Sequence, residues 1–316
     1  MSYSLLMVMD PIDQVNIVKD TSFGLLLEAQ RRGWDLYYCQ QRDLYLEQGE
    51  VRASCQSVKV FNDPNQWFEV QASEQKSLHQ FGAVLMRKDP PFDMNYIYST
   101  YLLELAETQG TLVVNNPRSL RDCNEKLYTA WFPKLTPPTL VTSNAHRLKQ
   151  FVTEQKDVIL KPLDGMGGAS IFRIKQDDPN TSVIIETLTG GGQHLAMAQR
   201  FIREITAGDK RILIVNGEVI PYVLARIPQK GETRGNLAAG GSGVPMPISD
   251  QEKQLAETIA PELVKRGLYF VGLDVIGNYV TEINVTSPTC MRELDKEYDI
   301  NIAAKLFAAL ELKIKQ

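Results

Sequence analysis

The stretch ILKPLDGMGGASIFRI, residues 159–174, decides which kind of fold the chain adopts. An apolar run ends at Lys161, and three glycines follow at positions 165, 167 and 168. Phosphate loops of the P-loop and dinucleotide-binding types need a helix directly after their glycines. The residues that follow here, SIFRI, are mostly β-branched or aromatic with a period of two, which predicts a strand. The glycines are therefore expected to connect two strands.

Two interpretations of this glycine hairpin are open. The backbone N–H groups of Gly165, Gly167 and Gly168 can approach phosphate oxygens closely, because glycine has no side chain in the way. Lys161, at the end of the preceding strand, can add a positive charge to the same phosphates. The alternative is a plain long hairpin beside an exposed lysine, and the glycine spacing alone does not separate the two.

A second informative stretch is YFVGLDVIGNYVTEINVTSP, residues 269–288, which predicts two apolar strands around Gly277 and Asn278. Glu282 and Asn284 are two residues apart on the second strand, so their side chains share one face. Polar residues on the wet face of a sheet are the alternative interpretation. Acidic groups in so apolar a setting fit that alternative poorly.

The register of this hairpin decides whether Asp274 joins the same face. A two-residue loop would set Asp274 against Thr281 and turn Glu282 to the other face. A three-residue loop, residues 277–279, sets Asp274 directly opposite Glu282, and this loop is predicted. Two carboxylates and the amide oxygen of Asn284 then form a cluster of hard oxygen ligands. Such a cluster suits Mg²⁺, which keeps some of its waters and binds the oxygens of a triphosphate.

The first 122 residues alternate strand and helix signals, which predicts a small open parallel sheet of the Rossmann-like kind. Ligands of such a sheet bind beyond the carboxyl ends of its strands. Asp10 and the stretch from Arg87 to Asp89 fall at such ends, with solvated turn residues as the alternative interpretation. The segment 47–80 shows no clean periodicity and is not assigned.

From residue 123 onward the pattern changes, because strands now follow strands through short turns. Helices are expected at residues 124–132 and 145–155, among strands at 139–143, 158–162, 194–202, 210–217 and 218–228. This order indicates antiparallel sheets in an α+β arrangement. The run Gly190–Gly192 lies between a helix and a strand, which predicts a turn that binds nothing.

The segment RIPQKGETRGNLAAGGSGVPMP, residues 226–247, is rich in glycine and has no periodic apolar pattern. It exceeds the ~12–15 residues at which an unstructured loop becomes uncommon in a compact domain. Strand-like sequence flanks it on both sides, so residues 226–243 are predicted to form a lid. Arg226 and Arg234 can bring positive charge to phosphate or carboxylate groups when such a lid closes.

The composition excludes several classes of function. The formal net charge is -4, from 34 basic and 38 acidic side chains, which argues against a nucleic-acid partner. The apolar amino terminus is too short for a signal peptide or a membrane helix, so no membrane partner is expected and the cytoplasm is the default location. The three histidines and four cysteines are too scattered for a zinc site or a disulfide framework.

Five motifs together resemble those of the ATP-grasp ligases, and within them the bacterial glutathione synthetases. They are MRKDPPFD at 86–93, SLRDCNEKL at 119–127, ILKPLDGMGGASIFR at 159–173, ARIPQKGETRGNLAAGG at 225–241 and EINVTSPTC at 282–290. The resemblance covers nearly the whole chain and is weakest from about residue 47 to 80. It implies a pre-ATP-grasp substrate domain at 1–122 and a two-lobed ATP-grasp domain at 123–316, with lobes 123–202 and 203–316.

The resemblance also implies a role for each site residue. ATP would be bound by Lys126, Lys161, Gly165, Gly167, Gly168, the hinge residues Gln199, Arg200, Phe201 and Ile202, and Asp209 at the ribose. Catalytic arginines would be Arg211, Arg226 and Arg234. Two Mg²⁺ ions, with Mn²⁺ as a possible substitute, would be held by Asp274, Glu282 and Asn284. The peptide substrate would be held by Arg87, Asp89, Thr286 and Ser287.

The implied reaction joins γ-glutamylcysteine to glycine through an acyl phosphate, with ADP and phosphate released, in a homotetramer. Ser242 stands where relatives carry a basic residue, which puts that one lid contact in doubt. A ligase of the same class with other substrates, such as a D-alanine or glutamate ligase, is the nearest alternative. A nucleotide-binding regulatory module without turnover is a second alternative, which the intact set of lysines and acidic residues argues against.

Overall fold

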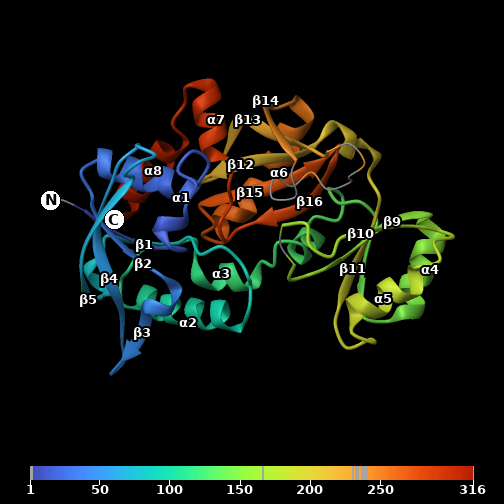
Figure 1. Ribbon diagram of the computed structural model, residues 1–316, viewed down its shortest axis with the longest axis horizontal. Coiled ribbons are helices and arrows are strands. Elements are labelled where there is room, and N and C mark those ends of the chain that lie inside the picture. The colour runs from blue at the N-terminus through green and yellow to red at the C-terminus, as the bar shows by residue number, and fades with distance from the viewer. Residues whose placement is uncertain (1–2, 166, 230, 232–234, 236–240, 316) are drawn as a thin grey trace.

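The computed structural model describes residues 3–165, 167–229, 231, 235 and 241–315, and these form three sheets with flanking helices (Figure 1). A seven-stranded sheet is built by the amino-terminal third, a four-stranded sheet by the middle of the chain and a five-stranded sheet by the carboxyl-terminal third. None of the described helices is long and apolar enough to cross a membrane.

The predicted parallel sheet is present in the amino-terminal third. Its parallel strands are β1 (Ser4–Val8), β2 (Asp35–Cys39), β6 (Ala83–Met86) and β7 (Val113–Val114). Helices α1 (Thr21–Arg31), α2 (Met94–Thr108) and α3 (Pro117–Asp122) connect or follow these strands. The carboxyl ends of β1 and β6 lead to Asp10 and Lys88, whose side chains form an ion pair of 2.8 Å.

The unassigned segment 47–80 adds antiparallel strands to this sheet, so the sheet is mixed. They are β4 (Glu50–Val60) and β5 (Phe68–Ser77), and β3 (Leu44–Glu47), just before the segment, pairs with β4. The burial of β4 alternates, but a bulge between Gln56 and Val58 interrupts the alternation. Nearly all of β5 is exposed. The period of two that identifies a half-buried strand is therefore broken within β4 and missing from β5.

The middle of the chain forms a small lobe, residues 139–200, around the four-stranded sheet. Its strands are β8 (Thr139–Thr142), β9 (Asp157–Pro162), β10 (Phe172–Lys175) and β11 (Ala196–Arg200), with helices α4 (Ala145–Gln155) and α5 (Thr181–Thr189). Strands β9 and β10 pair antiparallel, so the prediction that the glycine loop joins two strands is confirmed. The helix expected at 124–132 is instead a short 3₁₀ helix, Leu127–Trp131.

The carboxyl-terminal sheet has the order β14-β13-β12-β15-β16, and every neighbouring pair is antiparallel. Its strands are β12 (Asp209–Val215), β13 (Glu218–Ile227), β14 (Ser242–Pro247), β15 (Phe270–Ile276) and β16 (Tyr279–Asn284). Helices α6 (Asp250–Lys265), α7 (Met291–Tyr298) and α8 (Ile302–Ile314) accompany it. Ser249 begins α6 with a capping box that includes Glu252.

The hydrophobic cores show how the three sheets are joined. One core contains Leu6 and Val84 of the amino-terminal sheet together with Leu273 and Ile283 of the carboxyl-terminal sheet. A second core also spans both sheets. The core of the small lobe, around Leu160, includes none of the described residues of the other two sheets. The small lobe is thus packed on its own, at one end of the molecule in Figure 1.

Helix α8 packs against α1 of the amino-terminal domain through apolar and ionic contacts. The rings of Trp34 and Phe307 meet edge to face at 5.4 Å. Glu28 of α1 is 4% exposed and accepts hydrogen bonds from Arg31, Arg32 and Asn301. Burial alone would raise the pKa of Glu28, but these donors outweigh it and lower that pKa to about 2. The carboxylate therefore stabilises the folded state in its charged form.

Replacing Glu28 with glutamine is expected to lower the free energy of unfolding at pH 7 by about 2 kcal/mol, as for the loss of charged hydrogen bonds. The folded pKa lies below the ordinary 4.5, so this stabilisation is present above pH 4.5 and is lost as the pH falls toward 2. Urea unfolding of both proteins should therefore give a smaller difference at pH 3 than at pH 7. An equal difference at both values, or the same loss for exposed Glu257→Gln, would contradict this prediction.

Candidate active site

The hairpin of β15 and β16 places Asp274 directly opposite Glu282, as predicted. The turn is not the predicted one, because Ile276 pairs with Tyr279 and the loop has only two residues. A bulge after Asp274 restores the expected register by leaving Thr281 without an opposite residue. The Thr281 hydroxyl donates to the Asp274 carbonyl at 3.2 Å, which ties the bulge to the facing strand.

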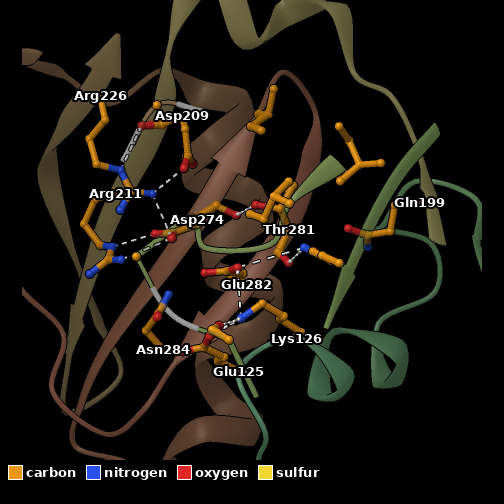
Figure 2. A pocket seen from close by; sticks show the side chains of 18 of the residues that line it. Glu125, Lys126, Gln199, Asp209, Arg211, Arg226, Asp274, Thr281, Glu282 and Asn284 are labelled. Atoms are coloured by element: carbon orange, nitrogen blue, oxygen red, sulfur yellow. Dashed lines mark hydrogen bonds and ion pairs between the residues drawn. The ribbon is translucent and has the colours of Figure 1, made fainter. Parts of the chain in front are cut away.

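Asp274 lies in a chain of buried charges that Figure 2 shows. Its carboxylate accepts two hydrogen bonds from Arg211, at 2.5 and 3.1 Å, and pairs with Arg226 at 2.7 Å. Arg226 also donates to Asp209 at 2.5 Å. Burial works against the charged form of Asp274, but the two arginines outweigh it and hold its pKa far below the ordinary value. The two arginines therefore favour the charged form of Asp274.

Glu282, on the same face of the hairpin as Asp274, lies beside two lysines. Its carboxylate lies 3.6 Å from the Lys126 ammonium and 4.0 Å from that of Lys161. Lys126 also donates to the Glu125 carboxylate and, at 2.6 Å, to the Gly165 carbonyl. Burial raises the pKa of Glu125, and the negative charge of Glu282 raises it further. Burial lowers the pKa of Lys161, whereas Glu282 and Glu125 raise that of Lys126 above its ordinary value despite burial.

A cavity of about 280 Å³ lies between the small lobe and the carboxyl-terminal sheet, and these charged groups line it. Eighteen of the twenty predicted site residues line this one cavity: Asp89, Lys126, Lys161, Gly165, Gly167, Gly168, Gln199, Arg200, Phe201, Ile202, Asp209, Arg211, Arg226, Asp274, Glu282, Asn284, Thr286 and Ser287. Arg234 lies outside the described residues, as does much of the predicted lid. Arg87 is the one described residue of the twenty that does not line the cavity.

Arg87 is buried behind the cavity wall. Its guanidinium donates to the Ser22 hydroxyl at 3.1 Å and to the Pro288 carbonyl at 2.9 Å. Its backbone carbonyl accepts a hydrogen bond from the Ser287 hydroxyl. Arg87 therefore supports the turn that carries Thr286 and Ser287, whose residues reach the cavity.

The cavity has an apolar end, at the strand that joins the small lobe to the rest of the chain. Ile159, Ile171, Ile202 and Ile276 line this end together with Phe201. A flat aromatic base fits between such aliphatic walls.

Two further contacts of the small lobe fix the residues at this end. Arg173 covers the Phe201 ring at 3.6 Å and is itself held by two hydrogen bonds to Asp157. Arg200 reaches across to the Tyr279 hydroxyl, at 3.0 Å, on the hairpin. The apolar end is thus braced from both the small lobe and the carboxyl-terminal sheet.

The polar end of the cavity fits a metal-bound polyphosphate. Asp274, Glu282 and Asn284 provide two carboxylates and an amide oxygen, and phosphate oxygens and water would complete the shell of Mg²⁺. No group of three or more His, Cys, Asp or Glu ligands occurs in the described residues, so a closed protein cage is not what these side chains form. The Asp209 Oδ1 atom is buried and has no hydrogen-bond partner in the described part of the chain, so it can accept from a ligand hydroxyl.

Two family models match the chain: the prokaryotic glutathione synthetase N-terminal domain over residues 3–121, and the prokaryotic glutathione synthetase ATP-grasp domain over residues 125–299. The chain belongs to the prokaryotic glutathione synthetase family. Members of this family are ATP-grasp ligases that join carbon to nitrogen, so the family and the class of enzyme expected from the motifs are confirmed.

Close relatives match the chain over almost its whole length. A glutathione synthetase from Vibrio vulnificus strain YJ016 is 60% identical over 315 residues, which are 100% of this chain and 99% of that protein. One from Pseudomonas aeruginosa is 55% identical over 314 residues, which are 99% of each.

Similar solved structures share the ATP-grasp fold at low sequence identity. D-cycloserine synthetase DcsG has a TM-score of 0.68 at 14% identity and covers 98% of this chain and 99% of its own. The ATP-grasp ligase PsnB, in a complex with Mg and ADP, has a TM-score of 0.65 at 18% identity and covers 99% of both chains. At these identities the likeness establishes only the fold.

Glu125 is a charged residue of the cavity that was not predicted. Glu125 lines the cavity and pairs with Lys126, and its backbone carbonyl accepts a hydrogen bond from Ile283 of β16. The signal for it is present in the motif SLRDCNEKL, where an acidic residue directly precedes the predicted lysine.

Proposed function

We propose that the chain joins the carboxylate of γ-glutamylcysteine to the amine of glycine, with ATP converted to ADP and phosphate. The observation that carries this proposal is one cavity lined by the lysines, arginines and oxygen ligands that ATP-dependent carboxylate activation requires. The family to which the chain belongs supports the choice of substrates.

In the proposed reaction a carboxylate oxygen of the dipeptide attacks the terminal phosphorus of ATP, and ADP leaves. The glycine amine then attacks the acyl carbon of the resulting acyl phosphate, phosphate leaves, and the amine loses a proton. Lys126, Lys161 and Arg211 hold the phosphates and neutralise their developing charge. The Mg²⁺ ions, held by Asp274, Glu282 and Asn284, would supply further neutralisation of the phosphate charge when bound.

The rest of the cavity would bind and orient the substrates. The backbone of residues 199–202 would hold the adenine beside the apolar walls, and Asp209 would accept from the ribose. Residues Gly165 to Gly168 would cover the phosphates. Asp89, Thr286 and Ser287 would hold the dipeptide, with Arg87 behind them. The predicted lid at 226–243 is shorter than expected, because residues 226–227 and 242–243 lie on the paired strands β13 and β14. Since an acyl phosphate hydrolyses readily, the segment between these strands, which includes Arg234, would exclude water, and Arg226 would act from β13.

We infer further that the chain divides into a substrate domain at 1–122 and an ATP-grasp domain at 123–316. The ranges of the two family matches, 3–121 and 125–299, support this division. A cytoplasmic homotetramer with two bound Mg²⁺ ions, or Mn²⁺ in their place, is the assembly proposed from the resemblance.

The purified chain is expected to release ADP when it is supplied with MgATP, γ-glutamylcysteine and glycine together. Omission of either amino-acid substrate or of Mg²⁺ should reduce the rate to background. The same assay with D-alanine, and with glutamate as the amine, tests the two alternative ligases. Turnover with only one of these alternative substrates would overturn the choice of γ-glutamylcysteine and glycine. Magnesium-dependent ATP binding without any turnover would support a regulatory module instead.

A further inference from the structure

Asn115 connects the amino-terminal sheet to the hairpin that carries the acidic site residues. It follows β7 directly and is 4% exposed. Its amide nitrogen donates to the carbonyls of Phe270 and Val285, at 2.9 and 2.7 Å. Its amide oxygen accepts from the backbone nitrogens of Tyr269 and Phe270, at 2.7 and 3.0 Å. All four hydrogen bonds of one carboxamide are thus made to the two strands of the hairpin.

These contacts lie where β15 and β16 separate. The last pair of the hairpin sets Gly272 opposite Asn284. An extension of this register by two residues would set Phe270 opposite Thr286. The backbone N–H and C=O of Phe270 are bound instead by the Asn115 side chain. The carboxamide therefore takes the place of the next backbone unit of β16, and Thr286 is free to turn away from the sheet.

The chain that turns away at this point forms part of the cavity wall. Thr286 and Ser287 line the cavity, and the Val285 carbonyl, which Asn115 holds, directly precedes them. The far side of the turn is fixed by Arg87, through the Pro288 carbonyl and the Ser287 hydroxyl. The turn is thus held at its first residue by Asn115 and at its end by Arg87.

We propose that Asn115 is a positioning residue for the peptide substrate, because it sets the point at which β16 leaves the sheet and so the place of Thr286 and Ser287. This inference rests on the proposed function, in which these two residues hold the dipeptide. It assigns no contact between Asn115 and any substrate. The nucleotide end of the cavity is built by the small lobe, by Asp209 of β12 and by Ile276 at the far end of β15, and Asn115 contacts none of these through its hydrogen bonds.

Only a carboxamide satisfies the four backbone groups. An aspartate at this position has no N–H to donate, and it would place its charge against the carbonyls of Phe270 and Val285. A serine can replace one donor and one acceptor but is too short to bridge both strands. We therefore expect both substitutions to loosen the turn, and the aspartate to do so more strongly.

The test compares Asn115→Asp and Asn115→Ser with the wild type in the ADP-release assay, with each substrate varied in turn. For Asn115→Asp we expect the KM for γ-glutamylcysteine to rise about tenfold or more, as for two lost hydrogen bonds, and for Asn115→Ser about fivefold. The KM for ATP should stay within about twofold of the wild type, since misplacement is confined to the turn. If the aspartate variant does not fold, the uncharged serine variant provides the same comparison.

Ser119→Ala is the matched control. The Ser119 hydroxyl donates to the Arg266 carbonyl at 2.6 Å, so it also joins the amino-terminal domain to the ATP-grasp domain, but away from the turn. We expect this variant to lose stability without a change in either KM. An unchanged KM for the dipeptide in a folded Asn115 variant, equal rises for ATP and dipeptide, or the same selective rise in Ser119→Ala would overturn the inference. Failure of the wild type to use γ-glutamylcysteine would instead overturn the proposed function.

Discussion

Replacing Glu282 with alanine is expected to lower the rate of ADP release by about a thousandfold or more, the usual size of effect when a principal electrostatic group of a phosphoryl-transfer site is lost. The carboxylate is one of two that face the cavity from the hairpin, and it lies within 4.0 Å of both site lysines. Its removal takes away a metal ligand and leaves two buried ammonium groups without their shared partner. Phosphate binding and metal binding should therefore both suffer.

Two measurements distinguish a loss of metal-dependent ATP binding from a loss of the fold. Calorimetry should show that ATP binds the variant with a much smaller dependence on Mg²⁺ than it does the wild type, while circular dichroism confirms an unchanged fold. Glu218→Ala is the matched control, because Glu218 lies on the same sheet and pairs only with the exposed Lys305 among the described residues. Activity of Glu282→Ala close to that of the control would refute the metal role.

Arg211→Lys is expected to reduce kcat by about a hundredfold, even though the positive charge is kept. The guanidinium of Arg211 holds both oxygens of Asp274, and a lysine can hold only one of them as a point charge. The carboxylate of Asp274 would lose its fixed orientation, because the donors of an ammonium do not form the planar fork that holds both oxygens of Asp274 and also faces a transferring phosphate. The effect should fall mainly on kcat, because the interaction is strongest when charge develops on the phosphoryl group.

The neighbouring Lys210 provides the control for this substitution. Its side chain points to the other face of β12 and pairs with Glu252 of α6, away from the cavity. Lys210→Met should leave kcat within about twofold of the wild type and lower only the stability, by about 1 kcal/mol or less. Equal losses of kcat in the two variants would indicate a general disturbance of β12, and a wild-type kcat in Arg211→Lys would show that the paired guanidinium is not needed.

The sequence was most informative where function and fold require the same residues. The glycine hairpin and the D…E-x-N hairpin were both recognisable, because each has apolar, strand-like sequence on both sides of a turn that contains glycine. The register of the second hairpin was predicted correctly, although the predicted three-residue loop was wrong. A bulge at Thr281 has the same effect on which face Glu282 occupies as an extra loop residue, and sequence patterns do not separate the two.

Features that depend on distant contacts were not predictable in this way. Strand β5 has no apolar face, since only pairing with β4 holds it in the sheet. Arg87 was expected to reach a substrate, but whether its guanidinium turns to the cavity or to Pro288 is decided by residues about 200 positions away. The roles of Asn115 and Glu125 likewise arise only when the chain near these two residues meets the hairpin of β15 and β16.

Helix α8 determines when the core beside β1 and α1 can be completed during synthesis. Its side chains Leu306, Phe307 and Leu310 belong to the same core as Leu5 and Phe23, so α8 covers β1 and α1, which are synthesised much earlier. A nascent chain on the ribosome must therefore carry an uncovered apolar surface until α8 has emerged, and chaperones would have this surface to bind until then.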